Sequence, residues 1–69
     1  MKYVVLIHCN GAAFGDDPGA EVARILRKLA DMEDGHPHFA PGHEQGLRDL
    51  NGNEVGFADV IADDQIRTI

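Results

Sequence analysis

Three histidines stand close together in the sequence and are the residues best suited to bind a metal ion. His36, His38 and His43 have Asp34 and Glu44 beside them, and imidazole and carboxylate groups are ligands that zinc and nickel accept. Two prolines stiffen the same segment, however, and the spacing matches no structural zinc motif. Metal binding by this loop is therefore kept as an alternative, and the sequence predicts no cofactor.

His8 and Cys9 are the other residues whose types could do chemistry, as a thiol and its base. Neighbours in a strand point to opposite faces of the sheet, so this pair lacks the direct hydrogen bond that nucleophilic catalysis requires. A single cysteine cannot form an internal disulfide either, and a buried structural thiol is expected. The chain is predicted not to be an enzyme.

Acidic residues dominate the second part of the chain. Twelve acids against six bases give a formal net charge of −6, and residues 31–69 hold nine of those acids but only two of the bases. An acidic field repels phosphates and anionic lipids and attracts basic protein surfaces. Solubility alone is the competing explanation for such a charge. The acids expected to form a partner-binding surface are Asp31, Glu33, Asp34, Asp49, Glu54, Asp59, Asp63 and Asp64.

One amphipathic helix, expected over residues 16–33, must position these groups. Asp17 can cap the first free amides. Pro18 suits the first helical position, because a backbone N–H at that position would have no partner within the helix. Gly35 follows as a stop signal. The helical spacing predicts an apolar stripe made by Val22, Ile25, Leu26 and Leu29, with Glu21, Arg24, Arg27, Lys28 and Asp31 on the opposite side.

Strands are expected on both sides of this helix. Residues 3–7 are rich in β-branched side chains and apolar at both parities, which predicts a strand that is central or covered on both faces. Asn51-Gly52 between two short runs predicts a β-hairpin with a type I′ turn. Val55 and Phe57 are expected to share one face, with Leu50 joining them across the turn. Asp59 is expected to end or bend the second strand.

Between helix and hairpin, residues 35–46 are rich in histidine, proline and glycine and are predicted to be a flexible loop. A chain of 69 residues has room for a single domain, 1–69. The predicted fold class is α+β, a small β-α-β-β domain with the helix packed on a three-stranded antiparallel or mixed sheet. Residues 65–69 remain an open candidate for a fourth strand. No run of apolar residues is long enough to span a bilayer, and a cytoplasmic monomer is expected.

The order of these pieces resembles a family of short acidic proteins encoded by phages and prophages. The pattern combines an Asn-to-Phe loop, an Asp-Pro pair, a Glu-Val-Ala-Arg-Ile-Leu-Arg-x-Leu-Ala helix and a Leu-Arg-Asp-x-Asn-Gly-Asn-x-Val-Gly hairpin. The matching residues are 10–14, 17–18, 21–30 and 47–56. The histidine loop and residues 59–69 depart from the pattern.

This resemblance implies a phage accessory protein that acts in the host cell. Small acidic phage proteins include anti-CRISPR proteins, several of which are similar to double-stranded DNA in their charge. The expected function is therefore anti-CRISPR activity, in which an acidic DNA mimic blocks the basic nucleic-acid-reading surface of a CRISPR effector subunit. The alternatives are a metal-binding protein that uses the histidine loop, and an accessory protein whose acidity serves only solubility.

Overall fold

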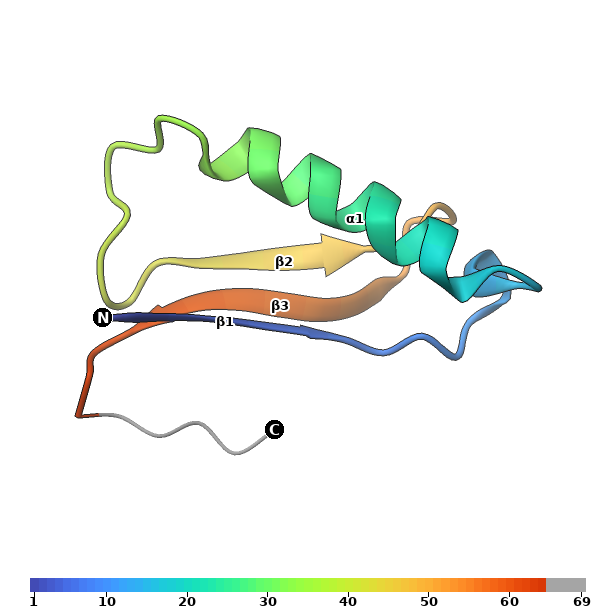
Figure 1. Cartoon of the computed structure of the whole chain (residues 1–69), viewed down its shortest axis with the longest axis horizontal. Coiled ribbons are helices and arrows are strands. Elements are labelled where there is room, and N and C mark those ends of the chain that lie inside the picture. Colours follow the sequence, from blue (N-terminus) through green and yellow to red (C-terminus); the bar gives the residue numbers. More distant parts are fainter. Residues whose placement is uncertain (65–69) are drawn as a thin grey trace.

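The computed structural model describes residues 1–64, which form one helix packed on a three-stranded sheet (Figure 1). In chain order the elements are β1 (Lys2–Ile7), a 3-10 turn η1 (Ala12–Phe14), α1 (Pro18–Glu33), β2 (Glu44–Arg48) and β3 (Glu54–Ile61). The predicted α+β class and β-α-β-β order are confirmed. The candidate strand at residues 65–69 lies outside the described residues. Within residues 1–64, no helix has the length and apolar character needed to cross a membrane.

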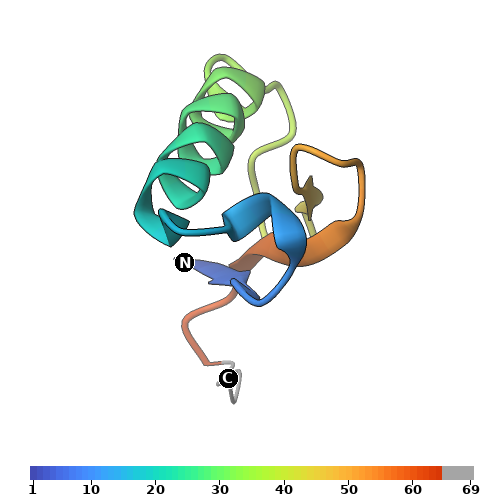
Figure 2. The same ribbon diagram turned by 90° about the vertical axis from the view of Figure 1, so that its right-hand side faces the viewer.

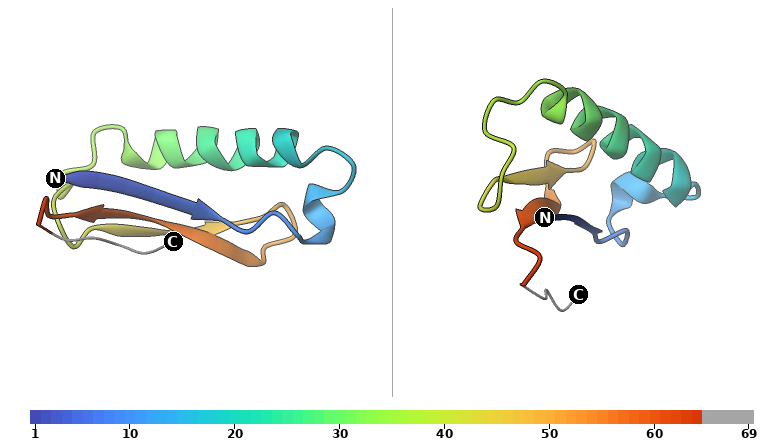
Figure 3. Two further views of the ribbon diagram at one scale, coloured as in Figure 1. Left: turned by 60° about the horizontal axis from the view of Figure 1, so that its bottom comes forward. Right: turned by 60° about the vertical axis from the view of Figure 1, so that its left-hand side comes forward.

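The sheet has the order β1-β3-β2, and both pairings are antiparallel. β3 is therefore the central strand, and of the two alternatives predicted for residues 3–7, a central position or cover on both faces, the central position is wrong. β1 is an edge strand whose first two residues are exposed and whose other four are half-buried. Its apolar residues at both parities reflect partial burial on each face. Figures 2 and 3 show that α1 lies on one face of the sheet only.

The helix begins as its sequence predicts. The Asp17 side chain accepts a hydrogen bond from the backbone N–H of Ala20 (3.1 Å), and Pro18 occupies the first helical position. Ile25 and Leu29 are buried against the sheet. Leu26, predicted for the same stripe, is 43% exposed, because the buried side of α1 is rotated toward β2.

Glu21 is the second correction to the helix, because it was expected on the solvent side and is 6% exposed. Its carboxylate accepts two hydrogen bonds from the Arg24 guanidinium (2.6 and 3.0 Å) and one from the backbone N–H of Leu50 (2.7 Å). These bonds lower the pKa of Glu21, the Arg24 contact most, and the ion pair raises the pKa of Arg24. Glu21 thus joins the start of α1 to the β2–β3 turn.

The core fills the space between α1 and the sheet. Phe14, in η1, is 2% exposed and packs with Ile25 and Leu29 of the helix and Leu47 and Ala58 of the sheet. The turn before the helix is therefore part of the core and fixes where α1 starts.

The β2–β3 hairpin exists, but its turn differs from the prediction. Asn51 does not have the positive φ that type I′ requires; Gly52 alone does within the turn (83°). The backbone N–H of Gly52 donates to Asp49 O (3.0 Å), and the Asp49 side chain accepts from the N–H groups of Asn51 and Asn53. Leu50 is at the tip and 69% exposed, so its predicted contact across the turn is also wrong.

A β-bulge changes which hairpin residues face the helix. The register passes from Leu47↔Gly56 to Arg48↔Glu54, which leaves Val55 as the extra residue of β3. Val55 consequently packs in the core, whereas Phe57 has the opposite parity to buried Ala58 and faces away from α1. β3 also continues through Asp59 to Ile61. The predictions of a shared face for Val55 and Phe57 and of a strand that ends at Asp59 are therefore wrong.

The loop between α1 and β2 is shorter than predicted, because β2 begins at Glu44. Gly35 ends the helix with φ of 71°, as a residue without a Cβ can. Backbone hydrogen bonds from Gly42 to Val60 O (3.1 Å) and from Val60 to His43 O (2.9 Å) attach the end of the loop to β3. The histidines of the loop therefore lie at the same end of the sheet as the C-terminus of α1.

Candidate functional site

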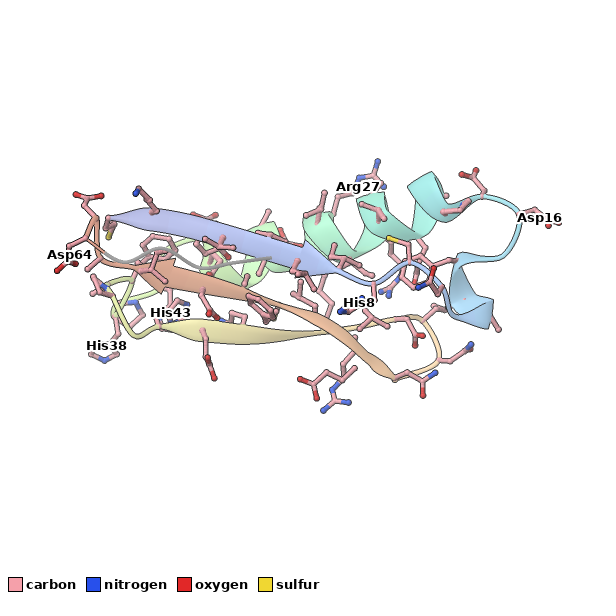
Figure 4. The ribbon with its side chains drawn as sticks, turned by 90° about the horizontal axis from the view of Figure 1, so that it is seen from below. His8, Asp16, Arg27, His38, His43 and Asp64 are labelled. Atoms are coloured by element: carbon pink, nitrogen blue, oxygen red, sulfur yellow. The ribbon has the colours of Figure 1, made fainter. Side chains whose placement is uncertain are left out.

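The fold gathers carboxylates at one end of the molecule. The pairs Lys2↔Ile61 and Glu44↔Asp59 place the start of β1, the start of β2 and the end of β3 together. The last turn of α1 reaches the same end, and Figure 4 shows Asp64 and His38 there, far from Asp16. We call this surface the acidic end and define it by its exposed carboxylates, Asp31, Asp34, Glu44, Asp63 and Asp64.

The electrostatics of this end are unfavourable for the helix itself. A helix C-terminus carries partial negative charge, so basic side chains stabilise it and acidic ones do not. The last turn of α1 has no basic residue, and Asp31, Glu33 and Asp34 occupy it and its cap. The N-terminal ammonium forms an ion pair with Asp63 (2.6 Å), but both groups are largely exposed, and such pairs contribute little. Helix stability therefore does not explain these acids.

Glu33 lies under the acidic end and joins three elements through its carboxylate. The Tyr3 hydroxyl of β1 donates to Oε2 (2.6 Å), and the Gln45 amide of β2 donates to Oε1 (3.3 Å). His43 Nε2 lies 2.8 Å from the same Oε1. The side chains of Glu33 and His43 are only 12% and 9% exposed. This cluster fixes the end of α1 to both outer strands.

The pKa values follow from these contacts. Burial raises the pKa of Glu33, but the hydrogen bonds from Tyr3, His43 and Gln45 together outweigh it and leave the pKa below its usual range. Partial burial and the neighbouring Glu33 carboxylate raise the pKa of Tyr3 well above its ordinary value. Glu33 is therefore held ionised and Tyr3 neutral at pH 7, and the pair acts as a structural connection.

The candidate metal ligands of the alternative hypothesis, His36, His38 and His43, do not form a coordination site among residues 1–64. The rings of His36 and His43 lie 4.2 Å apart and those of His36 and His38 6.3 Å apart. Yet His43 Nε2 contacts Glu33, and His36 Nδ1 accepts the backbone N–H of His38 (3.2 Å). Among residues 1–64, no three histidine, cysteine, aspartate or glutamate side chains are arranged to hold a metal ion. The histidines pack with one another and with Phe39 as a ring cluster.

The eight acidic residues predicted to form a partner-binding surface do not all lie on one surface. It brings Asp31, Asp34, Asp63 and Asp64 together at the acidic end, with Glu33 beneath them, and leaves Glu54 exposed at the hairpin end. Asp49 and Asp59 are each 5% exposed and offer no surface to a partner. Asp49 instead accepts the hydrogen bonds that shape the β2–β3 turn.

Sequence reasoning missed Glu44, Tyr3 and Gln45. The sequence predicts Glu44 in the loop, beside the candidate metal ligands, whereas it begins β2 and adds an exposed carboxylate to the acidic end. Tyr3 and Gln45 join the cluster through contacts that span 30 and 12 positions of the sequence. No local pattern indicates contacts of that range.

Cys9 is exposed, so its expected burial is wrong. The thiol lies 3.6 Å from the carbonyl oxygen of Ile7, and no hydrogen bond joins it to His8 in the described part of the chain. β1 ends at Ile7, so His8 and Cys9 both lie outside the strand.

Comparisons of this chain with protein-family models, with curated proteins and with solved structures found no match.

Proposed function

We propose that this chain is a binding protein whose acidic end occupies a basic surface of another protein. The observation that carries the proposal is the gathering of Asp31, Asp34, Glu44, Asp63 and Asp64 at one end, including helix positions where acids cost stability. Side chains that destabilise their own helix and gain no compensating interaction there indicate a functional role. No catalytic role is assigned to any residue.

The concrete form that we propose is anti-CRISPR activity, following the resemblance to phage proteins. DNA presents about one negative charge per 1.7 Å of helix axis, and proteins that read it bind these charges with Lys and Arg. Carboxylates held on a folded end can satisfy the same cations. The Glu33 cluster supports this role because it fixes the helix end relative to both outer strands, so that less conformational entropy is lost on binding.

Charge reversal at the two ends of the molecule tests this proposal. Asp34→Lys/Asp64→Lys alters the acidic end, and Asp16→Lys/Glu54→Lys makes the same change of net charge at exposed sites of the opposite end. Displacement of fluorescent target DNA from purified CRISPR effector complexes of several types is the measurement. We expect the wild type to displace DNA, the first variant to lose at least about tenfold in affinity and the second to lose much less. Binding should also weaken steeply between 50 and 200 mM salt, as binding through phosphate-like charges does.

Two outcomes would contradict the proposal. Equal losses in both variants would show that net charge matters and the acidic end does not. Failure of the wild type to displace DNA from any effector complex would reject the CRISPR assignment. Circular dichroism of each variant, with an unchanged helix signal, excludes misfolding as the cause.

A further inference from the structure

A groove lies between α1 and β2, on the side of the helix away from β1. It has a volume of about 230 Å³ and is lined by Ile25, Lys28, Met32, Gly46, Leu47 and Arg48. Its floor is apolar, since Ile25 and Leu47 are each 2% exposed and Met32 is packed against the core. This volume is several times the roughly 30 Å³ that one water molecule occupies in the liquid, so an aliphatic side chain fits.

The groove runs beside an open edge of the sheet. β2 is an outer strand, and the bond from Val60 N–H to His43 O identifies residues 43 and 60 as a hydrogen-bonded pair. In an antiparallel ladder such pairs alternate, so residues 45 and 47 bond to β3 and the backbone of Gly46 points outward. Arg24 Nη2 donates to Arg48 O (3.2 Å), which agrees with this alternation. Gly46 therefore presents its backbone beside the groove.

The charge of the groove is opposite to that of the molecule. Two of the six basic residues, Lys28 and Arg48, line it, and no carboxylate of residues 1–64 does. Lys28 makes no hydrogen bond or ion pair within residues 1–64, while Arg48 is exposed and donates to Gly52 O (3.0 Å). Both side chains are long and flexible, so an anionic group placed over the apolar floor is within their reach.

We propose that this groove binds the C-terminal end of an extended peptide whose last residue is apolar. The peptide backbone pairs with β2 at Gly46, the apolar side chain lies on Ile25, Met32 and Leu47, and the terminal carboxylate lies between Lys28 and Arg48. Strand addition to an open edge combined with capture of a terminal carboxylate is an established way to recognise peptides. A single carboxylate also suits a molecule of net charge −6, which repels polyanions and further copies of itself.

Fluorescence anisotropy of a short labelled peptide tests this proposal on the whole chain. The probe alternates threonine and valine and ends in valine with a free carboxylate. We expect saturable binding, and a loss of at least about tenfold when the terminus is amidated or when alternate peptide nitrogens are methylated. Lys28→Glu/Arg48→Glu should lose as much. The matched control, Lys2→Glu/Arg27→Glu, makes the same change of net charge away from the groove and should lose much less.

Several results would overturn the proposal. One is the absence of saturable binding, and another is equal binding of the free and amidated peptides. Equal losses in the two charge variants would assign the effect to net charge. Unchanged binding of the methylated peptide, together with full competition by a short-chain carboxylic acid, would identify a small-molecule site without strand addition. Self-association of the chain that Lys28→Glu/Arg48→Glu abolishes would assign the groove to a second copy.

Discussion

At the scale of single residues, Gly56 is under the tightest steric constraint. A Cβ at this position would overlap the carbonyl oxygen of Leu6 on the neighbouring strand. Gly56 follows the bulge at Val55 and pairs with both Ile7 and Leu47. The missing side chain thus lets β1 and β3 approach each other where the sheet bends.

Gly56→Ala should destabilise the fold. Because the obstacle is backbone, β1 must shift, and we expect the free energy of unfolding to fall by about 1–3 kcal/mol. Gly46→Ala is the control, since a Cβ there meets only the Glu54 side chain at 3.7 Å, and a change within about 0.5 kcal/mol is expected. Urea unfolding of the two variants is the measurement. Equal destabilisation would show that the approach of β1 is not the constraint.

Residue chemistry that acts locally was predictable from the sequence. Asp17 and Pro18 start the helix because their effects reach only three or four positions. The burial of Glu21 and Asp49 was not predictable, because charged residues are seldom buried unless they are paired. Glu21 finds its backbone partner 29 positions away, at Leu50. Only the complete fold brings that donor to it.

At the scale of elements, the kind of element was easier to predict than its neighbours. The helix and both hairpin strands follow from periodicity and turn residues. The strand order β1-β3-β2 does not follow from these patterns, because the same apolar run occurs in a central strand and in a half-buried edge strand. The bulge at Val55 reverses the parity of part of β3, so Val55 and Phe57 face opposite sides although their spacing of two residues predicts one shared face.

Glu33 connects α1 to both outer strands, so its replacement should loosen these elements together. In Glu33→Gln, Tyr3 and His43 lose a charged hydrogen-bond partner, and we expect the free energy of unfolding at pH 7 to fall by about 1–3 kcal/mol. Chemical denaturation is the measurement. The control is Asp31→Asn, which alters an exposed carboxyl of the same helix turn and should have little effect.

The same variant should change the pH dependence of stability. The pKa of Glu33 is lowered in the folded state, so its contribution is fully present above the unfolded value of about 4.3 and is lost as the pH falls through the folded value. The wild type should therefore lose more stability than Glu33→Gln between pH 5 and pH 3. Parallel acid profiles for the two proteins would show that the cluster does not hold Glu33 ionised. Glu21, whose pKa is also lowered, contributes equally to both profiles.

At the scale of the whole molecule, composition predicted the acidic character of the surface but not its distribution. Nine acids in residues 31–69 are visible in the sequence, yet Asp49 and Asp59 are buried, and Glu54 lies at the other end. The acidic end exists because α1 returns along the sheet and ends beside the first residues of β1 and β2. A surface assembled from three segments depends on strand order, the part of the fold that local patterns do not encode.

At the acidic end, the stability of the fold and the binding of a basic partner favour opposite charges. Asp31→Lys/Asp34→Lys places cations at the negative end of α1, and each exchange should stabilise the fold by about 0.3–1 kcal/mol at low salt. The same variant should bind a basic partner more weakly, since it removes two carboxylates from the proposed surface. Thermal unfolding and the DNA-displacement assay measure the two effects. A variant that is more stable yet binds less cannot have lost binding through unfolding, whereas unchanged binding would remove the last turn of α1 from the interface.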